Sequence, residues 1–179
     1  MPRHSSLSTA KILRLVLIAL AAAYPLAYLT VALLRAGYPF DLEWMEGGML
    51  DQTMRLLDGK SLYTQPGIDY VPYVYTPLYF YVSAAVITIV GPGFFALRLV
   101  SIASSLVCLG IIVGIAYKET GNRVMALLAA SLFAAMFGIT RGWFDLGRVD
   151  SLFLALLLVG VYLVRFHTSG PAYVAAGVL

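Results

Sequence analysis

Uncharged apolar segments alternate with short charged segments along this chain, and their lengths are the first guide to its fold. A helix needs about 20 apolar residues to cross roughly 30 Å of hydrocarbon. The segment from Leu15 to Leu34 has that length and carries no charge, so it predicts a membrane-spanning helix. A cleaved signal peptide is the alternative, but this segment is longer than the apolar part of such peptides and no small-residue cleavage site closes it cleanly.

Four later apolar segments predict further spans, at residues 99–117, 124–140 and 151–164 and, as the start of another, at 171–179. Residues 77–90 are also apolar, but the Gly91-Pro92-Gly93 turn and the prolines before them limit this segment to fourteen residues. That is short for a crossing, so a re-entrant or interfacial helix is predicted there, within an outer loop at residues 35–97. Residues 151–164 are equally short, so length alone does not decide between the two topologies.

The distribution of charge favours the topology in which residues 77–90 do not cross. Both acidic loops then face outward, and Glu119 is the only acidic residue on the cytoplasmic side. Basic residues gather on that side, as the positive-inside tendency requires: Arg3, Lys11, Arg14, Lys118, Arg123 and Arg165. If residues 77–90 do cross, the bilayer separates the two acidic loops. The sequence therefore predicts an all-α, polytopic transmembrane helical bundle in the cell (inner) membrane, with a cytoplasmic N-terminus and with interfacial or juxtamembrane helices in the long outer loop.

Composition supports a lipid environment and excludes several classes of protein. The chain is 61% hydrophobic and 12% charged, whereas soluble domains are roughly 25% charged. The net charge of +3 is small and the basic residues are spread out, so no nucleic acid partner is expected. Cys108 is the single cysteine, which excludes an intrachain disulfide, and the two histidines lack the companions that a zinc site needs.

Asp41 and Glu43 are the first candidate catalytic residues. They lie two positions apart, just after the first predicted span, and such a pair can act as a general base or bind a hard cation such as magnesium or manganese. The simpler interpretation is a loop that carries solvated acids. Because the pair lies only seven to nine residues after Leu34, it stays near the membrane surface, where Glu46 is expected to help bind substrate.

Residues 49–57 have the apolar spacing of a helix that lies on the membrane interface. Six tyrosines follow, at positions 63, 70, 73, 75, 79 and 81. The simpler interpretation is an aromatic belt at the headgroup level, and the alternative is that one or two of them stack on a sugar. Tyr75 and Tyr79 are the candidates for substrate binding.

A second group of charged residues lies between two predicted spans. Charges at a membrane boundary are costly unless paired, so one interpretation is an Arg148–Asp150 ion pair. In the functional alternative, Arg141 or Arg148 holds a phosphate, Asp150 positions an acceptor or a metal ion, and Asp145 contributes to substrate binding. Arg98 is expected to extend to the outer interface, where it too can meet a lipid phosphate.

Four segments carry a family resemblance through their order and spacing. They are Asp41-Leu42-Glu43, Thr76-Pro77-Leu78-Tyr79, Phe95-Ala96-Leu97-Arg98-Leu99-Val100-Ser101 and Arg148-Val149-Asp150-Ser151-Leu152. They resemble, in turn, the modified DxD motif, the HPPL-type segment, the "aRl.s" run and the second-loop aspartate of the GT-C glycosyltransferases, in particular the branch of the aminoarabinose transferases and protein O-mannosyltransferases. Tyr75 and Thr76 replace the histidine and first proline of the HPPL pattern, so no role of that histidine is carried over.

The resemblance implies transfer of a sugar from a polyprenyl-phosphate donor to a lipid, glycan or protein acceptor on the outer face. Asp41 would accept the proton of the acceptor hydroxyl, and Arg98, Arg141 and Arg148 would stabilise the leaving phosphate. Pro77 belongs to the matched substrate-binding segment. Family members are much longer, so residues 1–179 would be the N-terminal part of such a transmembrane domain and inactive alone.

The alternatives are non-enzymatic: a transporter, a lipid-scrambling module, or a membrane anchor without a site. Transporters place ionisable groups near the middle of the bilayer, often beside broken helices. In this chain nearly all ionisable residues lie at the edges of the apolar segments and in one long loop, which favours the enzyme.

Overall fold

The computed structural model describes residues 8–179, and over this range the protein is all-helical, as predicted. Arg3 and His4, which entered the charge and metal arguments, lie outside the described residues. The helices are α1 (Thr9–Ala36), α2 (Trp44–Leu57), α3 (Leu78–Val90), α4 (Phe94–Thr120), α5 (Arg123–Ile139), α6 (Asp150–Phe166) and α7 (Gly170–Val178). Each predicted apolar segment corresponds to one of these helices.

Helices α1 and α4 are long and apolar enough to cross a membrane, by length and composition. They contain 28 and 27 residues, which at about 1.5 Å per residue gives roughly 40 Å each. Their charged residues lie within the first two turns and the last turn, so the central part of each helix is uncharged. Helices α3 and α5 are apolar but shorter, with 13 and 17 residues.

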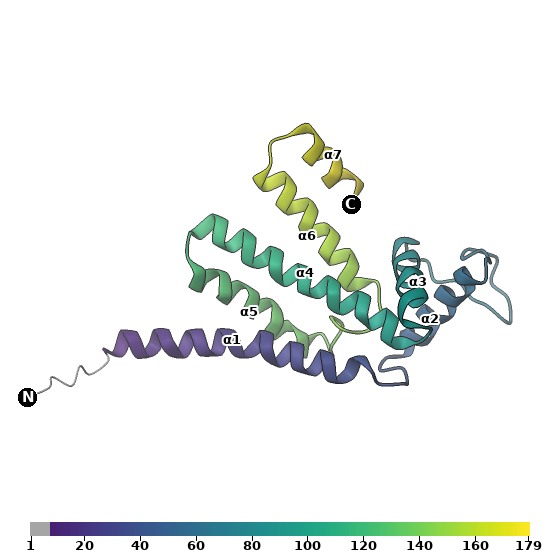
Figure 1. Cartoon of the computed structure of the whole chain (residues 1–179), viewed down its shortest axis with the longest axis horizontal. Coiled ribbons are helices and arrows are strands. Elements are labelled where there is room, and N and C mark those ends of the chain that lie inside the picture. Colours follow the sequence, from purple (N-terminus) through teal and green to yellow (C-terminus); the bar gives the residue numbers. More distant parts are fainter. Residues whose placement is uncertain (1–7) are drawn as a thin grey trace, which may run out of the picture.

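The long helices pack side by side in the order α1, α5, α4 and α6 (Figure 1). Helices α1 and α5 run one way, whereas α4 and α6 run the other way. The C-terminal ends of α1 and α5 therefore lie at the same end of the molecule as the N-terminal ends of α4 and α6. Both predicted acidic loops are at this end, as they must be if residues 77–90 do not cross.

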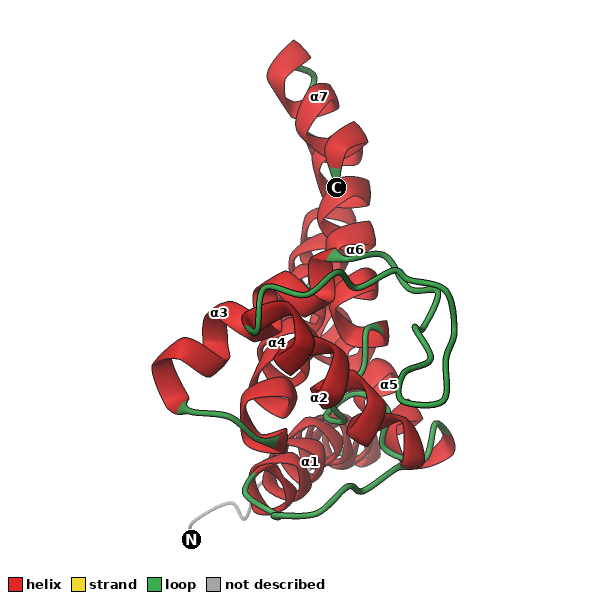
Figure 2. Ribbon diagram, turned by 90° about the vertical axis from the view of Figure 1, so that its right-hand side faces the viewer, coloured by secondary structure: helices red, strands yellow, loops and turns green. Residues whose placement is uncertain are grey.

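Helix α3 lies across the ends of the long helices rather than alongside them (Figure 2). One face, with Tyr79, Phe80 and Ile87, is buried against α2 and α4, while Ile89 on another face is 82% exposed. Gly91 ends the helix at a φ of +92°, a conformation that favours glycine. The placement of this helix at a membrane interface stays a prediction.

Two hydrophobic clusters hold the end of the molecule that carries the acidic loops. The first joins α2, α3 and the start of α4 and contains Met45, Met49, Leu62, Tyr79, Phe80, Ile87, Ala96, Leu97 and Val100. The second joins α1, α4 and α5, where the small side chains of Ala32, Ala36 and Ala134 allow close approach. The hydroxyl groups of Tyr28 and Ser105 hydrogen-bond across it. The acidic loops therefore rest on the best-packed part of the fold.

Several helices are longer than the predicted apolar segments, and the earlier starts of α2 and α4 have identifiable causes. Helix α2 begins at Trp44 rather than residue 49, because the Glu43 side chain accepts a hydrogen bond from the Met45 N–H at 3.1 Å and caps the first turn. Helix α4 begins at Phe94 rather than residue 99, because the charge of Arg98 is neutralised inside the fold and does not interrupt the helix.

Candidate functional site

A buried ion pair between Glu46 of α2 and Arg98 of α4 forms the foundation of the candidate site. Both side chains are 0% exposed. Arg98 donates from Nε to Oε1 at 3.0 Å and from Nη2 to Oε2 at 2.7 Å, which is the two-point geometry that guanidinium and carboxylate groups favour. The pair fixes the start of α4 against α2.

The remaining N–H groups of Arg98 hold the chain that leaves α1. Its Nη1 donates to the carbonyl oxygens of Arg35 at 3.3 Å and Tyr38 at 2.6 Å, and its Nη2 also donates to that of Phe40 at 2.7 Å. All five guanidinium donors are thus engaged. The expectation that Arg98 extends to the membrane surface is wrong, because Glu46 and three backbone carbonyls keep it inside the fold. A direct contact between Arg98 and a phosphate has no support in this geometry.

The Glu46 carboxylate also receives two backbone N–H groups, from Leu42 to Oε2 and from Gly147 to Oε1, each at 2.7 Å. Burial acts to raise the pKa of Glu46, but the bonds from Arg98, Gly147 and Leu42 outweigh it and lower the pKa below its ordinary value. Glu46 is fully buried and positions both acidic loops, so the prediction that it binds substrate directly is wrong.

The backbone on both sides of Asp41 is held by the Glu46–Arg98 pair. The carbonyl of Phe40 before it accepts from Arg98, and the N–H of Leu42 after it donates to Glu46. The Asp41 side chain itself is exposed, and it makes no ion pair within residues 8–179. The buried pair therefore presents a solvent-facing carboxylate from a fixed backbone.

Gly147 is required where the second loop meets the buried pair. A Cβ atom at this position would lie 2.9 Å from the Leu97 Cβ and 3.4 Å from Glu46 Oε1. Both neighbours are fully buried and cannot move away easily. The close approach of this glycine lets its N–H reach Glu46, and it places Arg148 beside the first loop.

Arg148 joins the two acidic loops. Its Nε donates to Asp150 Oδ2 at 2.9 Å, so the expected ion pair is present, and its Nη1 donates to Glu43 Oε2 at 3.0 Å. The Met45 sulfur lies 2.9 Å from Nη1, and the guanidinium lies 4.4 Å from the centre of the Trp143 ring. In the part of the chain that the structure describes, Nη2 makes no hydrogen bond. This nitrogen is the one through which Arg148 can bind an anion.

The charge balance at this cluster keeps the guanidinium protonated. Burial acts to lower the pKa of Arg148, but Asp150 and Glu43 outweigh that effect and raise the pKa above its ordinary value. The Arg148 side chain is 8% exposed, whereas those of Glu43 and Asp150 are 19% and 40% exposed. The cluster therefore consists of a nearly buried cation between two more exposed carboxylates.

The sequence also allowed a magnesium or manganese site. In the described range, no three metal-binding side chains lie together. Glu43 and Asp150 each place one carboxylate oxygen against the Arg148 guanidinium. Arg148 thus partly neutralises the charge of these two carboxylates.

Asp145 is the least satisfied group near the site. Its side chain is 1% exposed and lies 3.4 Å from Arg35 Nε, but neither carboxylate oxygen has a hydrogen-bond partner among residues 8–179. Burial raises the pKa of Asp145 from 3.8 to about 6, although Arg35 opposes the shift. A substrate would not reach this carboxyl without displacement of the surrounding side chains.

Lowering the pH from 8 to 5 is therefore expected to stabilise the protein through Asp145. The folded state binds the proton more tightly than the unfolded chain, so this contribution is complete below about pH 4 and is lost as the pH rises through about 6. The full pKa change from 3.8 to about 6 corresponds to roughly 3 kcal/mol, of which about 1.4 kcal/mol is gained between pH 8 and pH 5. Thermal unfolding in detergent at a series of pH values measures the effect.

The Asp145→Asn variant is the control for this pH series. The groups that face Asp145 are Arg35 and Tyr28 of α1, Glu46 of α2 and Arg98 of α4, and the variant leaves them in place. It is expected to unfold at a higher temperature than the natural protein at pH 8 and to lose most of the gain on acidification. An equal gain in both proteins would assign the effect to another group.

The other predicted site residues have different positions. Tyr75 is half-buried, and its hydroxyl lies 3.9 Å from the Met45 sulfur beside Arg148. Pro77 is exposed and precedes α3, whereas Tyr79 is 2% exposed and belongs to the core. Arg141 is exposed, has a φ of +55° and makes no ion pair within the described chain. Of these four, Tyr75 is the one that the structure brings to the Arg148 cluster.

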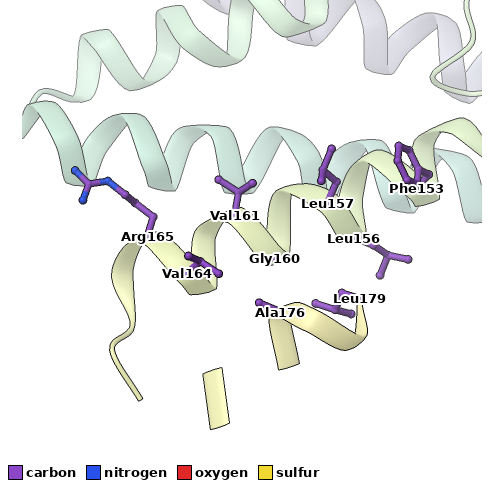
Figure 3. Close-up of a pocket in the computed structure, with 9 residues that line it drawn as sticks. All are labelled: Phe153, Leu156, Leu157, Gly160, Val161, Val164, Arg165, Ala176 and Leu179. Carbon is purple, nitrogen blue, oxygen red and sulfur yellow. The ribbon is translucent and has the colours of Figure 1, made fainter. Parts of the chain in front are cut away.

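Apolar grooves begin next to the cluster and follow α6. One groove of about 490 Å³ is lined by Val74, Tyr75, Thr76, Leu78, Tyr79, Val149, Leu152, Phe153, Leu156 and Leu179. Another of about 750 Å³ lies between α6 and α7 and reaches Arg165 (Figure 3). The two share Phe153, Leu156 and Leu179, so an apolar surface continues along α6 from Val149, the neighbour of Arg148.

Comparison of the chain with protein-family models, curated proteins and solved structures finds no match. The function is therefore argued from the geometry of the Arg148 cluster, together with the resemblance of the four sequence motifs.

Proposed function

We propose that this protein is a polyprenyl-phosphate-dependent glycosyltransferase of the GT-C type. It would be a multi-pass protein of the cell (inner) membrane, with a cytoplasmic N-terminus and an outward-facing site. One observation carries the proposal: Glu43 of the first loop and Asp150 of the second bind the same guanidinium, that of Arg148, beside the exposed Asp41. A carboxylate base and a cation with a free N–H are thus held at one end of the helices.

These groups fit the two charges that develop in glycosyl transfer. Asp41 accepts the proton as the acceptor oxygen forms its bond to the anomeric carbon. The bond from that carbon to the phosphate oxygen breaks, and Nη2 of Arg148 receives the negative charge of the leaving phosphate. Glu43 and Asp150 hold Arg148 in position. Direct displacement would invert the configuration at the anomeric carbon.

The apolar grooves along α6 suit the lipid part of such a donor. Tyr75 and Val149 line the groove at the end next to the Arg148 cluster, and the lining continues with aliphatic side chains of α6. An isoprenoid chain in this surface would have its phosphate near Arg148.

The placement of charge supports an enzyme over a transporter. The charged residues of α1 and α4 lie in the first two turns and the last turn of these helices, and no charged residue interrupts their central turns. A transporter is expected to place ionisable groups near the middle of the bilayer.

Replacing Arg148 with Gln is expected to reduce sugar transfer by the full-length protein by about 10²-fold or more, because the leaving phosphate loses its cation. The assay measures transfer from radiolabelled polyprenyl-phosphate sugars to membrane acceptors. Lys60→Gln removes an exposed cation that pairs with the exposed Asp58 and lines neither groove, and it should transfer normally. Unchanged transfer by Arg148→Gln would refute the proposed site, and absence of transfer from every donor tested would refute the proposed function.

A further inference from the structure

The end of the molecule opposite the candidate site is basic. The described basic residues at the start of α1, at the α4–α5 turn and at the end of α6 are Lys11, Arg14, Lys118, Arg123 and Arg165. Within the same described segments Glu119 is the single acid. This end therefore carries a net positive charge, whereas the candidate site is lined by carboxylates.

Two of these basic side chains already have partners. Arg165 pairs with Glu119 at 2.8 Å, and the Lys118 ammonium lies 4.6 Å and 4.7 Å from the ring centres of Tyr162 and Phe166. Arg14 and Arg123 are exposed and form no ion pair with any residue that the structure describes. These two arginines are left to bind an anion from outside the chain.

Each of these two arginines lies at an apolar groove. Arg14 lines a groove of about 460 Å³ between α1 and α5, with Ala10, Leu13, Leu17, Asn122, Val124, Met125 and Leu128. Arg123 lines one of about 340 Å³ between α4 and α5, with Val113, Gly114, Tyr117, Ala126 and Leu127. Asn122 lines the first groove and the adjacent Arg123 lines the second, so the two grooves flank the start of α5.

The start of α5 adds to the attraction for anions. Its first turn contains no acid, and the Asn122 side chain caps it by accepting from the Val124 N–H at 2.9 Å. The positive end of the helix dipole therefore acts in the same direction as Arg14 and Arg123. Basic pockets between membrane helices are sites for anionic lipid headgroups.

We propose that this pair of grooves binds an anionic phospholipid of the leaflet at this end, with its phosphate between Arg14 and Arg123 and its acyl chains in the two grooves. The apolar walls fit the chains, and the unpaired arginines fit a net negative headgroup. The proposal requires that the chain lies in a bilayer, but it uses no residue of the candidate site. The lipid-binding proposal can therefore be tested independently of sugar transfer.

The test compares lipids added to the purified full-length protein in detergent. Phosphatidylglycerol is expected to raise the unfolding temperature more than phosphatidylcholine and to remain bound in native mass spectrometry. The Arg14→Gln, Arg123→Gln double variant should bind phosphatidylglycerol roughly tenfold or more weakly. Inorganic phosphate at the same concentration should give no comparable stabilisation, because it lacks chains to fill the grooves.

Arg165→Gln is the matched control, since it removes one positive charge from the same end but from a residue that Glu119 already neutralises. It should retain the response to phosphatidylglycerol. Equal stabilisation by the two lipids, or an unchanged response in the double variant, would overturn the proposal. Stabilisation by inorganic phosphate alone would replace the lipid site with a simple anion site.

Discussion

Replacing Asp41 with Asn is expected to abolish sugar transfer by the full-length protein without changing its insertion or fold. Asparagine has nearly the same shape but cannot accept the acceptor's proton, and loss of a general base typically costs about 10²–10⁴ in rate. The Asp41 side chain is exposed and makes none of the contacts that hold the loop, which come from Phe40 and Leu42. Transfer from a polyprenyl-phosphate sugar measures the loss, and the unfolding temperature checks the fold.

Asp51→Asn is the control for this experiment. Asp51 is an exposed acid on α2, within the same outer loop, and it makes no ion pair within residues 8–179. Its replacement changes the net charge equally and should leave transfer unaffected. Normal transfer by Asp41→Asn would remove Asp41 from the mechanism, and equal losses in both variants would show that the loop responds to charge alone.

Replacing Glu46 with Gln is expected to destabilise the protein by about 3–5 kcal/mol, the usual effect of removing one partner from a buried ion pair. The Arg98 charge would remain at 0% exposure without a counter-charge. The neutral side chain would also weaken the hydrogen bonds from the N–H groups of Leu42 and Gly147, and so loosen the loops that carry Asp41 and Arg148. Thermal unfolding in detergent measures the first effect, and the transfer assay measures the second.

The exposed pair of Glu119 and Arg165 provides the comparison. These side chains are 41% and 63% exposed, so Glu119→Gln should change stability by less than about 1 kcal/mol. A similarly small change in Glu46→Gln would show that the buried pair does not hold the two loops together.

The helices could be predicted from the sequence because the length of an apolar segment between charges is a local property. The shared end of the two acidic loops followed from the distribution of Lys and Arg, and the Arg148–Asp150 pair from their separation of two residues. The contacts that build the site join residues far apart in the chain: Glu43 to Arg148 over 105 residues and Glu46 to Arg98 over 52. No local pattern specifies such pairings.

Arg98 shows why its position in the fold was predicted wrongly from the sequence. A lone arginine at the edge of an apolar segment is expected to extend towards water, because burial of an unpaired charge is costly. The cost disappears when a carboxylate and three carbonyls surround it, but those partners come from α1, α2 and the segment between them. Gly147 was missed for a similar reason, because it closely approaches Glu46 of α2 and Leu97 of α4, which are distant in the sequence. Trp143 was missed because its contact with Arg148 depends on how their own loop folds.

The hydrogen bond from Gly147 to Glu46 also bears on how the protein is made. It spans 101 residues, so the ribosome must add that many residues after Glu46 before its partner exists. At about 5–20 residues per second this takes roughly 5–20 seconds. Arg98 emerges about halfway through this interval. Glu46 therefore first acquires its counter-charge and only later the hydrogen bond from the Gly147 N–H. During biosynthesis, the segment from Arg35 to Glu46 is therefore expected to become ordered before the Arg148 cluster is assembled.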